Sequence, residues 1–447
     1  MSIIQTSNIK PQTSNQGETI CAIATAPGGA LGIIRISGKK SLEILSRIFS
    51  KDLTKVKPNT IHYGHIIDKT SNLKPQTSNL IDEVLVSVFR APHSYTGEDS
   101  VEISCHGSRY ILQRVVDTLC QQGCRMAEPG EFTQRAFLNG KMDLSQAEAV
   151  ADLIASENSS QHRLALSQLR GGITTRLQEL RDQLLHLTSL LELELDFSDQ
   201  DVEFADRTEL FCLIQSLDDH ISKLVRSFSE GNAIKEGIPV AILGAPNVGK
   251  STLLNALLGD DRAIVSDIQG TTRDTVEDTI TIGGRLFRFI DTAGLRHTDD
   301  TVEQMGIERS LRAAERARIV LLVAEPGVPY PDFSPRDDQQ VIRILNKSEH
   351  FQAINGPGLD ELRAQLLHAV SDSHSSTVIS NARHKAALSL ALDDLRRASD
   401  ALHQGVPTDL ASEDLRLCLQ HLGEITGGTI TSEETLHNIF KHFCIGK

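Results

Sequence analysis

Residues 244–251 read GAPNVGKS and have the spacing of a phosphate-binding loop, G-x-x-x-x-G-K-[ST]. The segment lies between a strand-like run, VAIL, and a helix-like run, STLLNALLG. The loop must lie there if its backbone N–H groups are to face phosphate oxygens. Lys250 would neutralise charge on the β- and γ-phosphates, and Ser251 would offer its hydroxyl to Mg²⁺. The pattern indicates a nucleoside triphosphate site.

Two further motifs follow in the order that a nucleotide switch requires. GTTRD (270–274) places Thr272 where it can reach the γ-phosphate and Mg²⁺. A predicted β-hairpin, TITI and RLFRFI joined by a Gly-Gly turn, then delivers DTAG (291–294) at a strand end. Asp291 suits a water-mediated contact with Mg²⁺, and Gly294 suits detection of the γ-phosphate. Three ordered motifs disfavour a glycine-rich turn that binds no nucleotide.

The base-reading motif departs from the usual form. Guanine-specific proteins use N-K-x-D, whose carboxylate accepts hydrogen bonds from N1–H and the amino group of guanine. This chain has NKSE at 346–349, and Glu349 is one methylene longer than aspartate. Glu349 makes the same two hydrogen bonds only if its backbone lies farther from the guanine. The surrounding region 325–358 is also expected to be shortened or irregular. Guanine preference remains the prediction.

Composition limits the class of protein. Over 447 residues the net charge is −14, which disfavours a protein coated in basic residues for non-specific nucleic-acid binding. Any RNA contact must therefore be local or shared with a partner. The seven scattered cysteines suit a reducing cytosol better than a disulfide framework. No leader-like start and no stretch of about 18 apolar residues is present, so a soluble cytoplasmic protein without a membrane contact is expected.

The pattern of apolar residues changes three times along the chain. Residues 18–140 mix strand-like runs such as GIIRIS with helical spacing, as in an α+β domain. Residues 141–232 are helical, and an α/β alternation runs from IPVAILG (238–244) to about 370, followed by helices again. The simplest architecture is one helical domain made from both flanks of an inserted α/β domain. The expected domain boundaries are 1–139, 140–233, 234–373 and 374–447.

A single long helix is expected in the first helical segment, because its apolar residues step by three and four. They are Leu166, Leu169, Ile173, Leu177, Leu180, Leu184, Leu187 and Leu191. A polar decamer, TSNIKPQTSN, recurs almost unchanged as TSNLKPQTSN (70–79), and polar surface inserts without function are expected there.

Beyond the phosphate loop, four strings resemble the MnmE (TrmE) family of tRNA-modification GTPases. They are APHSYTGEDSVEISCHG (91–107), PGEFTQRAFLNGKMDLSQAEAVADLI (129–154), DTAGLRHTDDTVEQMGIERS (291–310) and the terminal FCIGK. The resemblance implies an N-terminal folate-binding and dimerising α+β domain, a discontinuous helical domain and an inserted Ras-like P-loop G domain. HGS (106–108) departs from the family, where a second glycine is usual.

The resemblance also implies an activity. Such a protein is a potassium-dependent GTPase that acts with the flavoprotein MnmG (GidA). Together they add a carboxymethylaminomethyl-type group to C5 of the wobble uridine of tRNA. The one-carbon unit comes from a tetrahydrofolate derivative in the 5-formyl or 5,10-methylene form, and FAD enters only through the partner. A homodimer, and a heterotetramer with MnmG, are implied as well.

Residue roles follow from the same resemblance. Glu303 matches the residue that orients the attacking water, beside Lys250 and Thr272 as catalytic groups; taken alone, Glu303 would be read as a surface switch residue. Ser251 and Thr272 are the expected Mg²⁺ ligands. The implied K⁺ ligands are Asn247, Ser266, Ile268 and Thr271. The implied GTP-binding residues are Asn247, Val248, Gly249, Lys250, Ser251, Thr252, Ser266, Asp267, Ile268, Gln269, Gly270, Thr271, Thr272, Asp291, Thr292, Ala293, Gly294, Asn346, Lys347 and Glu349.

The folate site is implied at four charged residues that would each be read alone as surface charges. They are Arg35, Glu102, Lys141 and Lys447. Two basic groups suit a glutamate tail or a formyl-type oxygen, and a carboxylate suits the donor edge of a pterin.

Cys444 has three interpretations. A prenyl anchor is disfavoured because Ile445, Gly446 and Lys447 follow the cysteine. A spare thiol and a site thiol remain open from the residues, and the resemblance favours a thiol that lines the folate site.

Two other functions stay open. The chain could be an RNA- or ribosome-associated GTP switch without modification chemistry, or a scaffold that binds nucleotide weakly, which NKSE motivates. The folate residues distinguish the first alternative from the enzyme, since a switch has no use for them. Retention of Lys250, Ser251, Thr272, Asp291 and Glu303 argues against the scaffold.

Overall fold

The computed structural model describes residues 17–68, 80–196, 207–259, 278–290, 303–353, 358–370, 378–428, 433–441 and 443–446. Contacts divide the chain into two compact units, of which one is Met1–Ala151 with Leu419–Lys447 and the other is Asp152–Cys418. Both units contain helices, and each has one mixed sheet. We describe the two units separately.

The first unit is built on a six-stranded sheet with the order β3-β4-β5-β2-β1-β6. All neighbours are antiparallel except β1 and β6, which are parallel. The elements are β1 (Ile20–Ile23), β2 (Leu31–Ser37), α1 (Ser41–Ile48), β3 (Thr60–Ile67), β4 (Leu80–Phe89), β5 (Ser100–His106), α2 (Arg109–Gln121), β6 (Arg125–Met126), α3 (Glu131–Leu138) and α14 (Glu433–Phe440). Helix α4 (Leu144–Ile154) begins in this unit, and α13 (Thr408–Thr426) ends in it.

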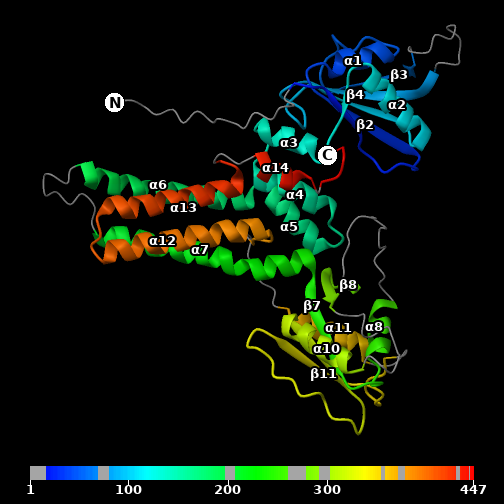
Figure 1. Ribbon diagram of the computed structural model, residues 1–447. Helices are drawn as coiled ribbons and strands as arrows, with labels where there is room; N and C mark the ends of the chain where they lie inside the picture. The colour runs from blue at the N-terminus through cyan, green and yellow to red at the C-terminus, as the bar shows by residue number, and fades with distance from the viewer. Residues whose placement is uncertain are drawn as a thin grey trace. The chain divides into compact units, whose positions relative to one another are not determined.

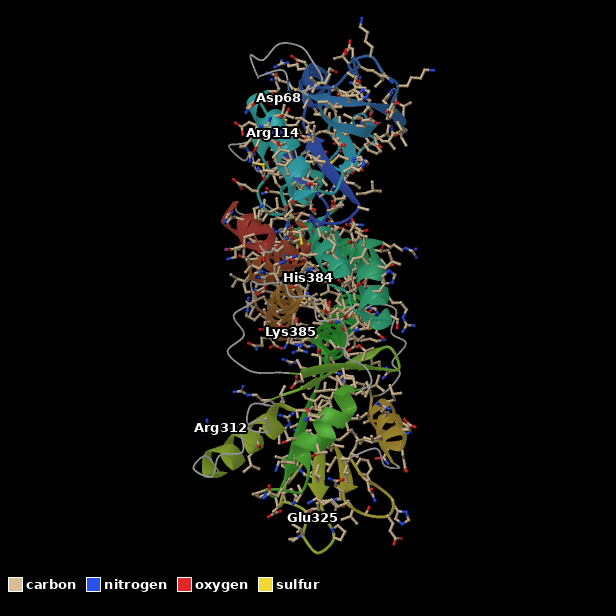
Figure 2. The ribbon with its side chains drawn as sticks, turned by 90° about the vertical axis from the view of Figure 1, so that its right-hand side faces the viewer. Asp68, Arg114, Arg312, Glu325, His384 and Lys385 are labelled. Carbon is tan, nitrogen blue, oxygen red and sulfur yellow. The ribbon has the colours of Figure 1, made fainter. Side chains whose placement is uncertain are left out.

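Helices α1 and α2 cover one face of this sheet (Figure 1). Their apolar side chains, such as Leu45 and Leu112, pack against Ile34 and Ile36 of β2, and all four are fully buried. Because side chains alternate along a strand, Arg35 lies on the opposite face of the sheet. An ion pair of 2.6 Å between Asp68 and Arg114, both labelled in Figure 2, joins the end of β3 to α2.

The C-terminal helix α14 packs back onto α3 and α4. Leu436 and Phe440 form a buried cluster with Leu144 and Ala147. The end of α14 comes closest to the start of α3 at Gly130, which has φ of 68°. A Cβ at Gly130 would lie 2.9 Å from the carbonyl oxygen of Phe440. A side chain at this position would therefore separate the C-terminal segment from α3.

The helical part of the second unit contains α5 (Ser159–Leu169), α6 (Gly172–Asp196), α7 (Arg207–Glu236) and α12 (Ala382–His403), with the start of α13. Figure 1 shows α7 running beside α12, and the two are linked by Arg396 and Asp218, whose Nε and Oδ1 are 2.6 Å apart. The Arg396 guanidinium lowers the pKa of Asp218 from its ordinary value. No helix in the described ranges is long and apolar enough to span a bilayer.

The prediction of one continuous helix through the apolar stripe is wrong. The chain turns at Gly171, which has φ of 83°, and the turn separates α5 from α6. A glycine adopts this left-handed conformation without the clash that a Cβ would cause. From Ile173 to Leu191 the stripe is confirmed as core, since all of its members on α6 are buried. Leu166 and Leu169 on α5 are only half-buried.

The second sheet has the order β11-β10-β7-β9-β8. Its elements are β7 (Ile238–Gly244), α8 (Lys250–Gly259), β8 (Asp278–Ile282), β9 (Arg285–Phe289), α10 (Glu303–Arg316), β10 (Ile319–Ala324), β11 (Gln340–Leu345) and α11 (Leu359–His368). The pairs β11–β10, β10–β7 and β7–β9 are parallel, and β8 is antiparallel to β9. Gly283 and Gly284 have φ of 57° and 78°, as a tight two-residue hairpin turn requires, and this confirms the predicted hairpin.

The crossover from β10 to β11, residues 325–339, contains neither helix nor strand. Four prolines occupy it, at positions 326, 329, 331 and 335, and proline removes the N–H donors that a helix needs. The crossover is instead held by Gln339, whose Nε2 donates to the carbonyl oxygens of Ala314 and Ala317 at 2.7 and 2.8 Å. These bonds satisfy the C-terminal end of α10.

The stripe on α6 provides a stability test. Leu180 is fully buried, so Leu180→Ala should lower the free energy of unfolding of the helical part by about 2–5 kcal/mol. Leu185 is 43% exposed on the same helix, and Leu185→Ala should change it by less than about 0.5 kcal/mol. Urea denaturation followed by far-ultraviolet circular dichroism measures both. Equal effects would show that the stripe is not the core of the bundle.

Candidate functional site

The segment 244–251 forms a loop between β7 and α8, as predicted. Asn247 and Gly249 both have positive φ, 63° and 93°, which turns the backbone sharply ahead of the helix. Gly244 approaches the neighbouring strand so closely that a Cβ would lie 2.5 Å from the carbonyl oxygen of Val323. Val248 is buried in the core under the sheet and fixes the middle of the loop.

Lys250 is the first residue of α8, and its ammonium lies in the loop. Nζ donates to the carbonyl oxygens of Gly244 and Ala245 at 2.9 and 2.8 Å. Burial lowers the pKa of Lys250 from its ordinary value. The first turn of α8 contains no acidic residue, and Ser251 and Thr252 are half-buried there. A helix N-terminus with a cation and no carboxylate favours an anion.

Asn346 connects this loop to the end of β11. Its Nδ2 donates to the carbonyl oxygen of Val248 at 2.8 Å, and its Oδ1 accepts from the backbone N–H of Ala353 at 3.1 Å. The side chain is 3% exposed. A Cβ on Gly249 would lie 2.3 Å from Nδ2, so only glycine allows the amide to reach the loop. The first residue of NKSE therefore fixes the phosphate loop.

Lys347 also contacts the loop. It has φ of 56°, and its Nζ donates to the carbonyl oxygen of Asn247 at 2.9 Å. The same ammonium forms an ion pair of 2.5 Å with Glu325, the first residue of the crossover, which Figure 2 labels. Glu349 is exposed and lies within a tight turn in which Ser348 N–H donates to the Phe351 carbonyl oxygen at 3.1 Å. Its role in reading guanine stays a prediction.

Several predicted site residues lie outside the described residues. They are Ser266, Asp267, Ile268, Gln269, Gly270, Thr271, Thr272, Asp291, Thr292, Ala293, Gly294 and Lys447. Glu303 is the first residue of α10, and its side chain is not among those described. The last residue of β9, Phe289, pairs with Val240 of β7, and the two parallel strands run toward the same edge of the sheet. The predicted Mg²⁺ and K⁺ ligand sets therefore stay predictions.

Two of the predicted folate residues meet on the face of the first sheet opposite α1 and α2. Arg35 of β2 is directly opposite Glu102 of β5, and its Nε and Nη2 donate to Glu102 Oε1 at 3.0 and 2.8 Å. Its Nη1 donates to the carbonyl oxygen of Gly446 at 3.1 Å. The guanidinium also lies 5.3 Å from the ring centre of Tyr95 and 5.6 Å from that of Phe132. Strand, loop, helix and C-terminal tail thus converge on one cation.

Lys141 is the other predicted folate residue among the described residues, and Lys447 lies outside them. Lys141 is exposed and donates to the carbonyl oxygen of Pro92 at 2.9 Å. Cys444 is exposed, and its carbonyl oxygen accepts from Gly130 N–H at 3.4 Å. Gly446 has φ of 95°, and a Cβ there would lie 2.5 Å from the Ile23 carbonyl oxygen. The tail therefore reaches the Arg35 site through a position that only glycine fits.

Sequence reasoning missed the aromatic half of this site. Tyr95 is anchored by its hydroxyl, 2.8 Å from Thr133 Oγ1, and burial raises its pKa. Phe132 is fully buried. Both lie within the strings 91–107 and 129–154, which carried the resemblance, so the signal was present. Aromatic rings attract a guanidinium that lies over their faces.

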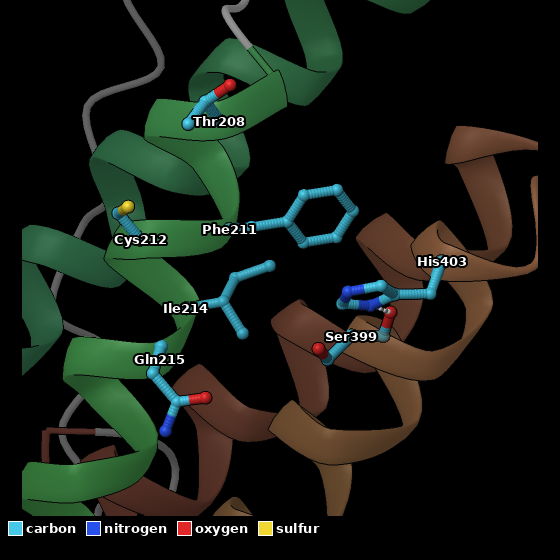
Figure 3. Close-up of a pocket in the computed structure, with 7 residues that line it drawn as sticks. All are labelled: Thr208, Phe211, Cys212, Ile214, Gln215, Ser399 and His403. Carbon is cyan, nitrogen blue, oxygen red and sulfur yellow. Dashed lines mark hydrogen bonds between the residues drawn. The ribbon is translucent and has the colours of Figure 1, made fainter.

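A separate cavity of about 480 Å³ lies between α7 and α12 (Figure 3). His403 stacks on Phe211 with ring centres 4.0 Å apart, and its Nδ1 donates to the Ser399 carbonyl oxygen at 2.8 Å. None of the predicted site residues lines it. We assign it no role.

Comparison with known proteins places the chain in a family. A family model described as the MnmE helical domain matches residues 144–444. Another, described as the GTP-binding protein TrmE N-terminus, matches residues 19–141. Together the two models span the first sheet with Arg35 and Glu102, and the helices, in agreement with the predicted N-terminal and helical parts.

Relatives align over nearly the full length. The tRNA modification GTPase MnmE of Bacteroides thetaiotaomicron is 49% identical over 471 residues, covering 96% of this chain and 99% of the relative. The MnmE of Parabacteroides distasonis is 51% identical over 468 residues, covering 96% of this chain and 100% of the relative. The MnmE of Flavobacterium johnsoniae is 45% identical over 472 residues, covering 96% of this chain and 99% of the relative. These alignments are longer than the chain, so the relatives contain residues that it lacks. The chain belongs to the MnmE family of tRNA modification GTPases.

Proposed function

We propose that the protein hydrolyses GTP and couples the hydrolysis to modification of tRNA. The observation that carries the proposal is the phosphate loop between β7 and α8, held by Asn346 of the NKSE motif. The relatives are named as tRNA modification GTPases, and they share about half of their residues with this chain. The alternative of a scaffold that binds nucleotide weakly requires no such connection between loop and base-reading motif.

Lys250 is the principal phosphate ligand in this proposal. In the structure its three N–H donors are partly used by the Gly244 and Ala245 carbonyls, which keep the ammonium in the loop. When a nucleotide binds, Lys250 would donate to phosphate oxygens in place of these carbonyls. The backbone N–H groups around Gly249 would donate to the phosphate as well. Burial strengthens the attraction, because charge interactions are less screened away from water. Lys250 thereby stabilises charge that develops on the β–γ oxygens.

Two cations would complete the site. Mg²⁺ would be held by Ser251 and Thr272, and K⁺ by Asn247, Ser266, Ile268 and Thr271. Bound cations supply positive charge beside the phosphates. The half-buried Ser251 in the first turn of α8 and the exposed Asn247 at the loop edge are compatible with these roles. Glu303 at the start of α10 would orient the attacking water, while Glu349 would accept from guanine.

The Arg35 site would hold the tetrahydrofolate derivative. The guanidinium beside Tyr95 and Phe132 suits a planar, partly anionic ligand, and Lys141 supplies a further cation. Lys447 and Cys444, at the end of the tail, would line the same site. In this proposal MnmG (GidA) brings FAD, the chain acts as a homodimer within a heterotetramer, and the product is the modified wobble uridine. A GTP switch without modification chemistry would not need this ligand.

Hydrolysis of GTP and ATP in potassium and in sodium tests the nucleotide site. GTP should be preferred, and its rate should fall when sodium replaces potassium. Lys250→Ala should lower the rate of GTP hydrolysis by about 100-fold or more, because a preorganised cation is lost from the transition state. Lys223→Ala, on the exposed side of α7, is the control. Equal rates of GTP hydrolysis in Lys250→Ala and Lys223→Ala would contradict the proposed role of the phosphate loop.

Asn346→Ala tests the connection between the base-reading motif and the loop. It leaves the buried Val248 carbonyl and Ala353 N–H without their partner, a loss of about 1–3 kcal/mol. Affinity for GDP should fall by roughly tenfold, as measured by titration calorimetry. Arg343→Ala on the exposed face of β11 should leave the affinity unchanged. Unchanged affinity in Asn346→Ala would mean that the loop is held without this bond.

Arg35→Gln tests the folate site independently of GTP. The variant keeps a polar side chain but loses the guanidinium, so affinity for 5-formyltetrahydrofolate should fall by about tenfold or more. GTP hydrolysis by the same variant should be unaffected. Arg47→Gln, which removes an exposed cation of α1, is the control. A wild-type protein with no measurable affinity for the folate would favour the GTP switch.

A further inference from the structure

A short segment of the first unit, residues 39–57, carries an excess of positive charge. It contains five lysines and one arginine but only two carboxylates, whereas the chain as a whole has 45 basic and 59 acidic residues. The segment comprises α1, the residues just before it and most of the irregular stretch that leads to β3. Its lysines are Lys39, Lys40, Lys51, Lys55 and Lys57. The segment is therefore locally basic on an acidic protein.

The charge of these lysines is not neutralised among the described residues of the unit. All five side chains are exposed, and none of them forms an ion pair with a carboxylate of that part of the chain. The two acidic residues of the segment are bound elsewhere. Glu43 pairs with Arg47 at 2.5 Å, and Asp52 Oδ1 accepts from the Thr54 N–H and hydroxyl at 2.9 and 2.7 Å. The ammonium groups are therefore available to an anion from outside.

The lysines after α1 belong to a loop with a fixed backbone. Leu53 is fully buried, and Val56 packs against the same core beneath α1 and α2. Lys51 Nζ donates to the carbonyl oxygen of Tyr63 in β3 at 2.6 Å, which holds the loop on the sheet and leaves the charge of the ammonium uncompensated. A fixed array of cations loses less conformational entropy on binding than a mobile tail does.

The make-up of this surface favours an RNA backbone over a membrane or a protein. None of the exposed large apolar side chains falls within residues 39–57, all of which the structure describes. Peripheral membrane helices insert apolar side chains beside their cations, and protein interfaces are centred on apolar and aromatic residues. RNA phosphates need neither, because lysine ammonium groups bind them as point charges.

The basic segment begins close to the Arg35 site. β2 carries Arg35 and ends at Ser37, so Lys39 and Lys40 follow that strand almost directly. Four residues of chain span at most about 14 Å, and this limits the distance between the Cα atoms of Arg35 and Lys39. RNA held at Lys39 and Lys40 is therefore near the site proposed for the one-carbon unit, although Arg35 lies on the opposite face of the sheet from α1.

We propose that the basic segment 39–57 is the surface on which the first unit binds the phosphate backbone of tRNA. The inference rests on the proposed function, which requires tRNA to meet a chain with a net charge of −14. Lysines before and after α1 contribute to the contact. Because ammonium groups on this surface bind phosphates rather than base edges, the contact positions the tRNA without selecting its sequence.

Two double variants test the contact, Lys39→Gln with Lys40→Gln and Lys55→Gln with Lys57→Gln. The probe is an unmodified tRNA transcript, whose affinity for the full chain is measured by fluorescence anisotropy over a range of KCl concentrations. Each double variant should weaken binding by about tenfold. The slope of log affinity against log salt should become shallower by about two, because each lost phosphate contact removes about one unit of slope. Lys51 is left unchanged because it holds the loop.

Two controls accompany these variants. Lys223→Gln with Arg316→Gln removes two exposed cations of the second unit and should leave both affinity and slope unchanged. Lys55→Arg with Lys57→Arg keeps both charges and should bind tRNA as the wild type does, which separates the loss of charge from damage to the loop. GTP hydrolysis should be unchanged in every variant, because the segment lies outside the phosphate loop.

The outcomes separate this inference from the proposed function. Wild-type affinity and slope in both glutamine double variants would overturn the inference alone. A wild-type protein that binds no tRNA would refute the proposed function and the inference with it. Loss of binding to phosphatidylserine vesicles in the glutamine variants, with tRNA binding unchanged, would show that the segment contacts a membrane instead.

Discussion

The amide of Asn346 is the interaction on which the nucleotide site depends. It reaches from the end of β11 past the end of β10 to Val248, in the loop that follows β7. The carboxyl ends of parallel strands meet at one edge of a sheet, and this makes the contact possible. A buried amide must satisfy both its donor and its acceptor, and Ala353 N–H supplies the second bond. Gly249 is then required, since any Cβ there would overlap the amide.

Arg35, like Asn346, is a single side chain that bonds two separate parts of the chain. Its guanidinium has donors in a fixed fork, and the fork divides between Glu102 on one side and the Gly446 carbonyl on the other. One partner belongs to the sheet, whereas the other belongs to a tail far away in sequence. At this site Glu102 balances the charge of Arg35. At the phosphate loop, by contrast, Lys250 begins a helix whose first turn contains no carboxylate, although the net charge of the chain is −14. The local placement of charge, rather than the net charge, therefore favours an anion at the loop.

Local rules predicted much of this structure from the sequence. The phosphate loop and the Gly-Gly hairpin depend on residues within ten positions, and both were predicted correctly. The break at Gly171 was missed, because one glycine in an apolar stripe does not reveal whether the helix continues. The link from Asn346 to Val248 spans 98 positions, and Tyr95 lies 60 positions from Arg35. Such contacts depend on sheet order, which periodicity does not determine.

The sequence position of the α/β segment between α7 and α12 has a physical explanation in the packing of α7. The chain leaves the bundle through Gly237 and returns along Ile379, whose N–H donates to Ser227 Oγ of α7 at 3.2 Å. At Gly231 the returning backbone is so close that a Cβ would lie 2.1 Å from the Ile379 carbonyl oxygen. Exit and return therefore use the same helix, within about three turns of each other. An insertion whose ends lie this close need not disturb the helices that flank it, and a small rotation at its root can leave the bundle intact.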